Sequence, residues 1–486
     1  MRTRIRADWV TGFREGRHTL IPQGELVWEA DRILFVGRDF PGRVDHEINA
    51  GPMLLAPGFI DCHVHAGYQI PHRLMSDHGR PDNLGQPFPE LEVSRKGTRN
   101  PLHDDPDDPW PLFTVAELLR NGVTSFVEVG APVAMQTRMA GAVGQLGLRA
   151  WLGASYDMGG WTTGEGGMLE RVIDPAHGAA RMQAAAEFSR RINGGQNGRL
   201  SAILAPSRID SCSVEQLRET ARLAGETAMP VSIHAASHVH EYYDILRRYR
   251  MTPIELLRET GLLDLGPLLT IGHGNFTSDH PQIVNSHGAR DVALLGSCGC
   301  SVSHCPVNLA RRGRILADWP GYARAGVNLT LGADTYPRDM IHQMRKASLM
   351  GKMVSGDLTT ASAAEVFTAA TLNGARALGR DDLGALEPGR KADLVLIRLA
   401  PDGVLRQSPL RDPIRAVVEC GQGDDVDTVV VDGVIRMQGG RIPGLDLADL
   451  ARAAQAKAEW IWQNWQDWDT LGRRAEEVCP PSFELE

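Results

Sequence analysis

The feature that most limits how this chain of 486 residues can fold is a series of eight short apolar segments. Stretches with helical periodicity separate them. Such alternation is typical of parallel strands joined by crossover helices. Helix-start signals lie between several segments, and both Thr252-Pro253-x-Glu255 and Thr114-x-x-Glu117 read as capping boxes. The pattern predicts a (β/α)8 TIM barrel, whose active site lies at the carboxyl ends of the strands. The predicted strands are residues 54–65, 123–130, 148–155, 200–207, 229–234, 268–273, 299–305 and 327–334.

The segments that flank this region carry short alternating runs and Asp-Gly turns instead. Residues 1–56 and 385–445 share this pattern, which predicts a small β-sandwich domain built from both termini. Residues 57–384 would then form the inserted barrel, and residues 446–486 a C-terminal helical extension. Because Trp is enriched at interfaces, the tryptophans of the extension either cover the barrel or β-domain, or form a subunit contact. They are Trp460, Trp462, Trp465 and Trp468.

Charge and composition limit the classes of partner. The chain has 51 Lys and Arg against 60 Asp and Glu, a formal net charge of -9, and no basic block. This balance argues against nucleic-acid binding and favours a small, neutral substrate. No apolar run of about 18 residues and no signal-peptide pattern appear, so we expect no membrane partner and a cytoplasmic location. Seven thinly spread cysteines indicate reduced thiols.

Five residues of metal-ligand type fall at the predicted strand ends. His63 and His65 are two apart in the first strand, so both imidazoles face the same side. His234 ends the fifth strand, His273 the sixth and Asp334 the eighth. Each one alone could be a structural residue, either a core histidine or a loop-capping carboxylate. The convergence of five nitrogen and oxygen ligands on one barrel mouth predicts a metal site.

Three longer segments carry further motifs: SHCPVNLARRG (303–313), LGADTYPRDMIHQMRKAS (331–348) and LGALEPGRKADLVLI (383–397). Together with the HVH of the first strand and the isolated His234 and His273, they resemble the amidohydrolase superfamily. The most similar group is that of triazine hydrolases and cytosine- or guanine-type deaminases. Molinate and phenylurea hydrolases are relatives of this kind, although no motif singles them out.

The resemblance implies that His63, His65, His234 and Asp334 bind one divalent ion. It also implies that His273 either ligates this ion or holds its water and the substrate. Binuclear relatives bridge two ions with a modified lysine, usually on the fourth strand, but SAILAPSRID contains none. We therefore expect a mononuclear site, with zinc as the first candidate and iron as the second. Relatives often assemble, which implies a homodimer or a larger homo-oligomer.

This ligand set implies hydrolysis, because a divalent ion lowers the pKa of a bound water toward about 7. Asp334 would move the proton to the leaving nitrogen, and His273 would orient the nucleophile or stabilise charge on the substrate. Deaminases of this group usually carry a glutamate three residues after the strand-five histidine. This chain has Ser237 there, and Glu241 lies too far along to substitute directly.

The missing acid favours an enzyme that hydrolyses a carbon–nitrogen bond in an amide, urea, carbamate or N-substituted heteroaromatic compound. Deamination of a purine, pyrimidine or triazine is the alternative. A non-catalytic binding protein on the same fold is a third reading, since fold does not determine function.

Other residues near the predicted strand ends are candidate substrate contacts. Glu128 either points into the mouth or is a buried, hydrogen-bonded carboxylate. His238 either lies at a solvated helix start or replaces part of the missing acid. The long segment 66–111 would fold over the metal and shape specificity. The full set of candidate contacts is Glu128, Ser207, Arg208, Ser237, His238 and His304.

Overall fold

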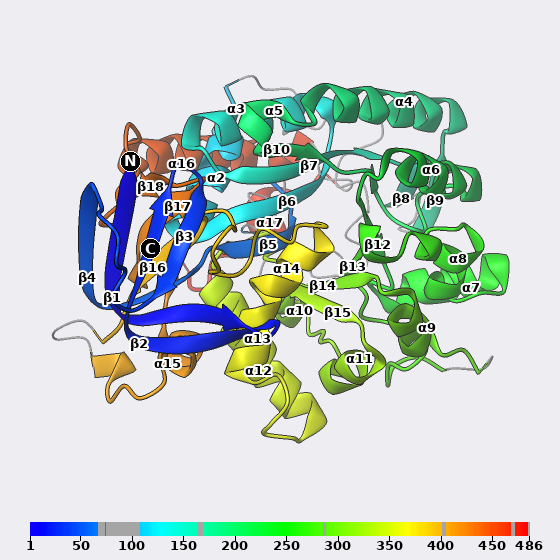
Figure 1. Cartoon of the computed structure of the whole chain (residues 1–486). Helices are drawn as coiled ribbons and strands as arrows, with labels where there is room; N and C mark the ends of the chain where they lie inside the picture. The colour runs from blue at the N-terminus through cyan, green and yellow to red at the C-terminus, as the bar shows by residue number, and fades with distance from the viewer. Residues whose placement is uncertain are drawn as a thin grey trace.

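The structure, a computed structural model, describes residues 1–66, 73, 107–163, 169–284, 288–400, 405–467 and 472–484. Trp468 and most of the segment 66–111 lie outside the described residues. Within these ranges no helix is both long and apolar enough to cross a membrane. Strands from the two ends of the chain lie together on one side, and helices surround the strands of the central region (Figure 1).

Seven strands from both ends of the chain form one sheet. They are β1 (Arg2–Arg14), β2 (Arg17–Glu29), β3 (Arg32–Gly37), β4 (His46–Pro57), β16 (Leu394–Arg398), β17 (Val426–Val431) and β18 (Val434–Met437). Their order is β18-β17-β16-β4-β1-β2-β3, so β4 pairs with the early strand β1 and with the late strand β16. Alternate apolar residues such as Ile5, Leu26 and Leu394 are buried in one cluster. Both termini thus build one β-unit as expected, while packing as a sandwich stays a prediction.

Eight parallel strand positions lie in the central region, each within a predicted strand or overlapping it. The fourth position is interrupted at Ile203, and its two parts both pair with the preceding strand. The strands are β5 (Phe59–Val64), β6 (Val123–Ala131), β7 (Arg149–Tyr156), β10 (Leu200–Ala202) with β11 (Ala205–Pro206), β12 (Val231–Ala235), β13 (Leu269–His273), β14 (Ser301–His304) and β15 (Asn328–Leu331).

These strands pair in sequence order as two parallel sheets, one from β5 to β11 and one from β12 to β15. Isolated parallel bridges link the sheets at both sides. Leu204 pairs with Val231 on one side, and Val64 pairs with Asp334 on the other. Because the strands are parallel, their carboxyl ends share one edge of the assembly.

Helices connect these strands, and the two predicted capping boxes test where two of the helices begin. The Thr252 capping box is confirmed, since its hydroxyl accepts from the amide of Glu255 and its own amide donates back to the Glu255 carboxylate. The Thr114 box is wrong, because the helix begins earlier, at Trp110, and Thr114 is buried inside it. The connecting helices are α2 (Trp110–Arg120), α3 (Val133–Leu146), α4 (Pro175–Ile192), α5 (Gly195–Gly198), α6 (Val214–Thr227), α7 (Val239–Tyr249), α8 (Pro253–Glu259), α9 (Asp291–Cys298), α10 (Pro306–Arg311), α11 (Trp319–Ala325), α12 (Met340–Ser355), α13 (Ala363–Ala369) and α14 (Leu372–Ala377).

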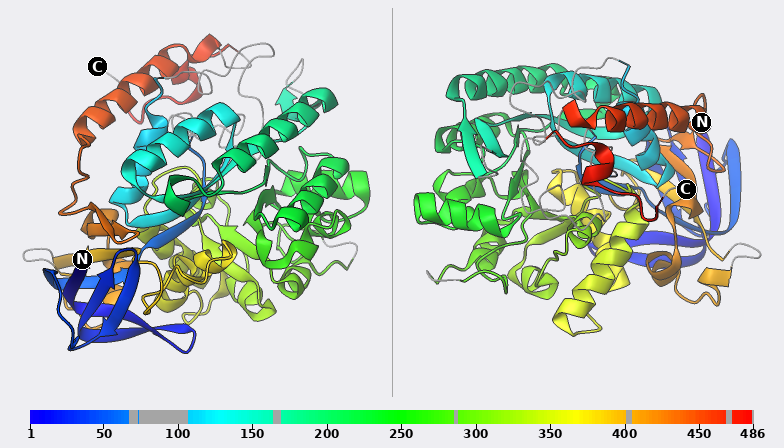
Figure 2. Two further views of the ribbon diagram at one scale, coloured as in Figure 1. Left: turned by 45° about the horizontal axis from the view of Figure 1, so that its top comes forward. Right: turned by 180° about the vertical axis from the view of Figure 1, so that it is seen from behind.

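The remaining elements are peripheral. The strands β8 (Gly159–Thr163) and β9 (Leu169–Ile173) form a separate antiparallel pair. The helices are α15 (Pro413–Cys420), α16 (Leu447–Gln463) and α17 (Ala475–Val478). Figure 2 shows α16 lying across the outside of the molecule beside α2. Trp465 and Trp110 are buried in one cluster at this contact, so the covering role is confirmed for Trp465, whereas Trp460 is 46% exposed.

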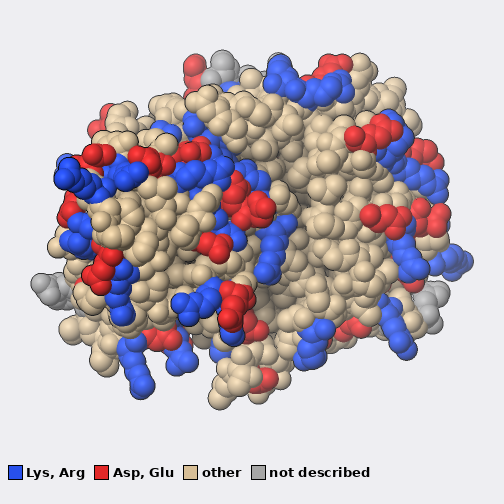
Figure 3. Space-filling model, viewed as in Figure 1, with Lys and Arg blue, Asp and Glu red and all other residues tan. Residues whose placement is uncertain are grey.

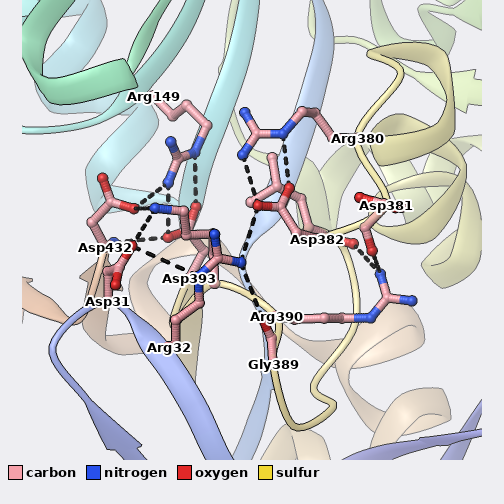
Figure 4. A network of polar contacts seen from close by, with 12 residues as sticks. Asp31, Arg32, Arg149, Arg380, Asp381, Asp382, Gly389, Arg390, Asp393 and Asp432 are labelled. Atoms are coloured by element: carbon pink, nitrogen blue, oxygen red, sulfur yellow. Dashed lines mark hydrogen bonds and ion pairs between the residues drawn. The ribbon is translucent and has the colours of Figure 1, made fainter.

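A buried polar network joins the terminal sheet to the central strands (Figure 4). Arg149 of β7 donates from Nε to Asp393 at 3.1 Å and from Nη2 to Asp432 at 2.6 Å. Asp393 precedes β16, and Asp432 lies between β17 and β18. Lys391 adds a second cation, 3.1 Å from Asp432. On the outer surface, by contrast, basic and acidic side chains are intermixed on the face shown in Figure 3.

Candidate metal centre

The five predicted ligands meet at the carboxyl ends of the parallel strands. His63 is the last but one residue of β5 and His65 directly follows that strand, His234 lies in β12, His273 ends β13 and Asp334 follows β15. The Nε2 atoms of His65 and His234 are 3.0 Å apart. The Asp334 carboxylate lies 3.6 Å from His65 Nε2 and 3.8 Å from His273 Nε2. The structure therefore brings all five side chains together.

The backbone at two of these residues is in the left-handed region, which non-glycine residues rarely adopt. His273 has a φ of 74° and Asp334 a φ of 64°. Such strain persists where the surrounding structure over-determines it, and it clusters at functional sites. Glycines beside His63 permit the close packing, because a Cβ at Gly272 would lie 2.7 Å from His63 Cε1 and one at Gly332 2.6 Å from His63 Cβ.

Burial keeps the imidazoles neutral. Desolvation lowers the pKa of His63 to about 4 and the pKa values of His65, His234 and His273 well below the usual range. His234 Nδ1 lies 2.6 Å from the carbonyl oxygen of Ser207. A carbonyl only accepts, so Nδ1 carries the proton and Nε2 presents its lone pair to the centre of the cluster.

These side chains fit a divalent ion. Ligand atoms of His63, His65 and His234 all lie within 4.8 Å of one another, as do those of His63, His273 and Asp334. Both ring nitrogens of His63 and Nδ1 of His273 are buried with no hydrogen-bond partner among the described residues. Neutral imidazole nitrogens with carboxylate oxygens are the donor set that zinc and iron accept.

Asp61 is a supporting residue that the sequence analysis missed. Its Oδ1 accepts from the amides of His63, at 3.2 Å, and Ala333, at 3.0 Å, and so ties β5 to the loop that carries Asp334. Burial raises the pKa of Asp61 to about 7. The strand period offered a signal, because Asp61, His63 and His65 are spaced by two and share one face.

Two further supporting residues come from distant parts of the chain. Asn308 of α10 donates its side-chain amide to Asp334 Oδ2. Arg338 is fully buried and donates to the carbonyl oxygen of His65 at 2.7 Å and to Glu117 at 3.1 Å. Both residues lie within the motif segments 303–313 and 331–348, but the sequence did not indicate their partners, because both contacts depend on the tertiary arrangement.

The residue at the position of the missing acid is held by a buried ionic cluster. Ser237 donates its hydroxyl to Glu241 at 2.7 Å, and Arg208 donates to the same carboxylate at 2.9 Å. Arg208 also bonds Asp210 at 3.1 Å and lies 2.7 Å from His238 Nε2. The predicted solvated position is wrong for His238, because the imidazole caps α7 while being only 1% exposed.

The other candidate contacts have structural partners of their own. Glu128 is a buried, hydrogen-bonded carboxylate, which accepts from the amide of Ala66 at 3.2 Å and from the side chain of Gln136. Burial raises the pKa of Glu128 to about 8. Ser207 acts through its carbonyl on His234. His304, at the end of β14, is buried near Trp319, and burial lowers its pKa to about 3.

Comparison with known proteins agrees with this geometry. The model of the amidohydrolase family matches residues 54–436, which include all five candidate ligands. The chain belongs to the amidohydrolase family. The prediction of an amidohydrolase enzyme is thereby confirmed at the level of the family.

Individual relatives cover nearly the whole amidohydrolase chain. A 5-methylthioadenosine/S-adenosylhomocysteine deaminase of Moorella thermoacetica is 29% identical over 89% of this chain and 94% of its own. The solved structure of a zinc-bound adenosine deaminase from Xanthomonas campestris has a TM-score of 0.74 at 23% identity, covering 94% and 98% of the chains. A zinc complex of atrazine chlorohydrolase from Arthrobacter aurescens has a TM-score of 0.76 at 20% identity, covering 94% and 100%. The two structures establish the fold that the chain shares with them.

Proposed function

We propose that this amidohydrolase hydrolyses a carbon–nitrogen bond in a small amide, urea, carbamate or N-substituted heteroaromatic compound with a metal-activated water. The observation that carries the proposal is the meeting of four neutral imidazoles and one carboxylate at the strand ends. When bound, a divalent ion supplies a hydroxide nucleophile near neutral pH. An open position in its coordination shell is what distinguishes a catalytic from a structural ion.

His63, His65, His234 and Asp334 would hold one ion, with His273 as a fifth ligand or as the group that orients the nucleophile. Zinc is the first candidate, supported by the zinc bound in two solved structures of the same fold, and iron is the second. The absence of lysine from residues 200–206 supports a single ion.

Asp334 would carry the proton from the attacking water to the leaving nitrogen. Its Oδ2 is bonded by Asn308, which leaves Oδ1 as the atom nearer His65 and available for proton transfer. His273 would stabilise developing charge on the substrate as a neutral donor.

The contacts of Ser237 support a leaving group that needs no acid at this position. The Ser237 hydroxyl donates a hydrogen bond to Glu241, and Arg208 pairs with the same carboxylate. We keep the proposal that six residues surround the substrate, although most of them are bonded to the backbone or to one another. They are Ser207, Arg208, Ser237, His238, Glu128 and His304.

A deaminase is the second candidate, favoured by the names of the curated relatives. The Moorella protein and a 5'-deoxyadenosine deaminase of Methanothermobacter thermautotrophicus, 29% identical over 90% of this chain, both act on adenosine derivatives by name. The leaving group separates the candidates. The test incubates the zinc-loaded protein with 5-methylthioadenosine and 5'-deoxyadenosine, and separately with phenylureas, carbamates and N-alkyl triazines. Amine released from the phenylureas, carbamates or N-alkyl triazines supports the first proposal, and ammonia from the adenosine compounds alone rejects it in favour of the second.

We also propose the larger organisation within which this chemistry takes place. The two parallel sheets would close through their bridges into one (β/α)8 barrel over residues 57–384. Residues 1–56 with 385–445 would form the terminal β-domain, and residues 446–486 the extension. A cytoplasmic homodimer or larger homo-oligomer is the proposed state, which sedimentation at several concentrations would test.

A further inference from the structure

One arginine of α10 lies beside the candidate metal centre. Asn308 of this helix bonds Asp334, and Arg311, three residues later, lies on the same side of the helix. Arg311 donates from Nη1 to the carbonyl oxygen of Tyr336, two residues after Asp334. Its Cζ also lies 3.9 Å from the centre of the Tyr336 ring. The guanidinium is thus anchored against the loop that presents Asp334.

Arg311 differs from the other arginines around the centre in its ionic partners. Arg208 is paired with Asp210 and Glu241, and Arg338 with Glu117. In the described part of the chain, Arg311 contacts the carbonyl oxygen and the ring of Tyr336, and no carboxylate lies within ion-pair distance of it.

The surroundings of Arg311 add positive charge. Desolvation lowers its pKa most, and the nearby charges of Arg73 and Arg312 lower it further, while Tyr336 and Asp334 act in the opposite direction. Arg73 also lies over the Tyr336 ring, with Cζ 5.2 Å from its centre. Arg311 remains exposed, so a ligand can reach its free donors.

We propose that the substrate carries a carboxylate and that Arg311 binds it, which replaces the expectation of a neutral substrate. This proposal rests on the proposed hydrolase function. A guanidinium has five donors in a planar fork, and the Tyr336 carbonyl occupies one side of it. The remaining donors can take both oxygens of a carboxylate, and such charge-assisted pairs are short, strong and geometrically selective.

The test measures binding and needs no turnover. The probes are straight-chain hydroxamates that end in a carboxylate, with two to six methylenes, together with the corresponding terminal carboxamides. Titration calorimetry with the zinc-loaded full chain gives the dissociation constant of each. At one chain length the carboxylate should bind at least about tenfold more tightly than its carboxamide, because hydrogen bonds between charged groups are worth at least that much. Arg311→Gln should abolish this preference while leaving carboxamide binding unchanged.

Arg324→Gln is the matched control, because Arg324 is also an exposed arginine in the last turn of a helix, α11, which like α10 lies between β14 and β15. It should keep the preference. Equal binding of both series, no binding by any probe, or a preference that survives Arg311→Gln would overturn the proposal and leave Arg311 only a clamp on Tyr336. A clear carboxylate preference without hydrolysis of any amide, urea or carbamate would instead reject the proposed function and keep the carboxylate site.

Discussion

Three hydrogen bonds fix the orientation of Asp334, two through its backbone and one through its carboxylate. Its amide donates to the carbonyl of His63 at 2.8 Å, and its own carbonyl accepts from the amide of His65 at 2.7 Å. Asn308 binds one carboxylate oxygen. The left-handed backbone at Asp334 is therefore over-determined by β5 and α10 together, which suits a residue that must place one oxygen accurately.

Asp334→Asn should lower kcat by about 10² to 10⁴, since it removes the proposed general base while keeping the size of the side chain. Steady-state kinetics on the best substrate of the amide and urea panel, with zinc content measured in parallel, checks this. Asp357→Asn, at an exposed turn, is the control and should retain full activity. Undiminished turnover in Asp334→Asn would exclude the proposed role.

The convergence of the candidate ligand residues could be predicted from the sequence, and the residues that support them could not. His63, His65, His234, His273 and Asp334 each follow a recognisable apolar run, so their convergence follows from strand order. The contacts of Asn308, Arg338 and Asp61 link segments far apart in sequence, and burial of a charge such as Arg338 contradicts its usual surface preference. Their roles depend on partners that only the folded chain supplies.

At the scale of elements, the β1–β2 hairpin reaches the helices beside the central strands. His18, next to the hairpin turn, lies 3.0 Å from the Thr371 hydroxyl and makes an edge contact with Phe367 of α13. Burial, with the charges of Arg390 and Arg376, lowers the pKa of His18 to about 4. The hairpin thus depends on a neutral imidazole.

Acid should weaken this contact. Between pH 6.5 and 4 the unfolded chain binds a proton at His18 that the folded chain does not, so folding stability falls as the pH drops through this range. The full difference is about 3 kcal/mol. His18→Gln should reduce the loss of stability between pH 7 and 4.5, measured by urea unfolding. The exposed His46→Gln should unfold like the parent protein at both pH values, and an unchanged profile for His18→Gln would refute the argument.

Elements were predictable where local chemistry decides them. All eight central strands appear near the expected residues, and the Thr252 cap forms as its sequence indicates. The Thr114 cap failed because Trp110, buried beneath α16, extends the helix by a turn toward the N-terminus. The break at Ile203 also lies in an uninterrupted apolar run, so local pattern gave no sign of it.

At the scale of the whole molecule, Arg149 joins the terminal sheet to the central strands. Arg149→Met should lower the free energy of unfolding by about 3–5 kcal/mol, because Asp393 and Asp432 would lose their buried cation. Arg218→Met, which breaks the exposed pair with Glu259, should cost no more than about 1 kcal/mol. Thermal unfolding of both variants checks this, and equal small shifts would show that the network contributes little.

Removal of the metal should also lower the stability of the whole molecule. A ligand that binds only the folded state adds stability, so a chelator should lower the melting temperature by at least about 3 °C, and added zinc should restore it. His234→Ala should respond much less to chelator and zinc, since one ligand is lost. A parent protein whose melting temperature ignores both reagents would argue against a resident ion.

The order of the seven-stranded sheet has a consequence for synthesis. As the chain leaves the ribosome, β4 can pair at once with β1, but its other edge must wait for β16, which emerges only after all the central strands. An apolar edge left open for so long invites pairing with other nascent chains. A messenger truncated anywhere before β16 should therefore yield aggregated product, even when it encodes every proposed metal ligand.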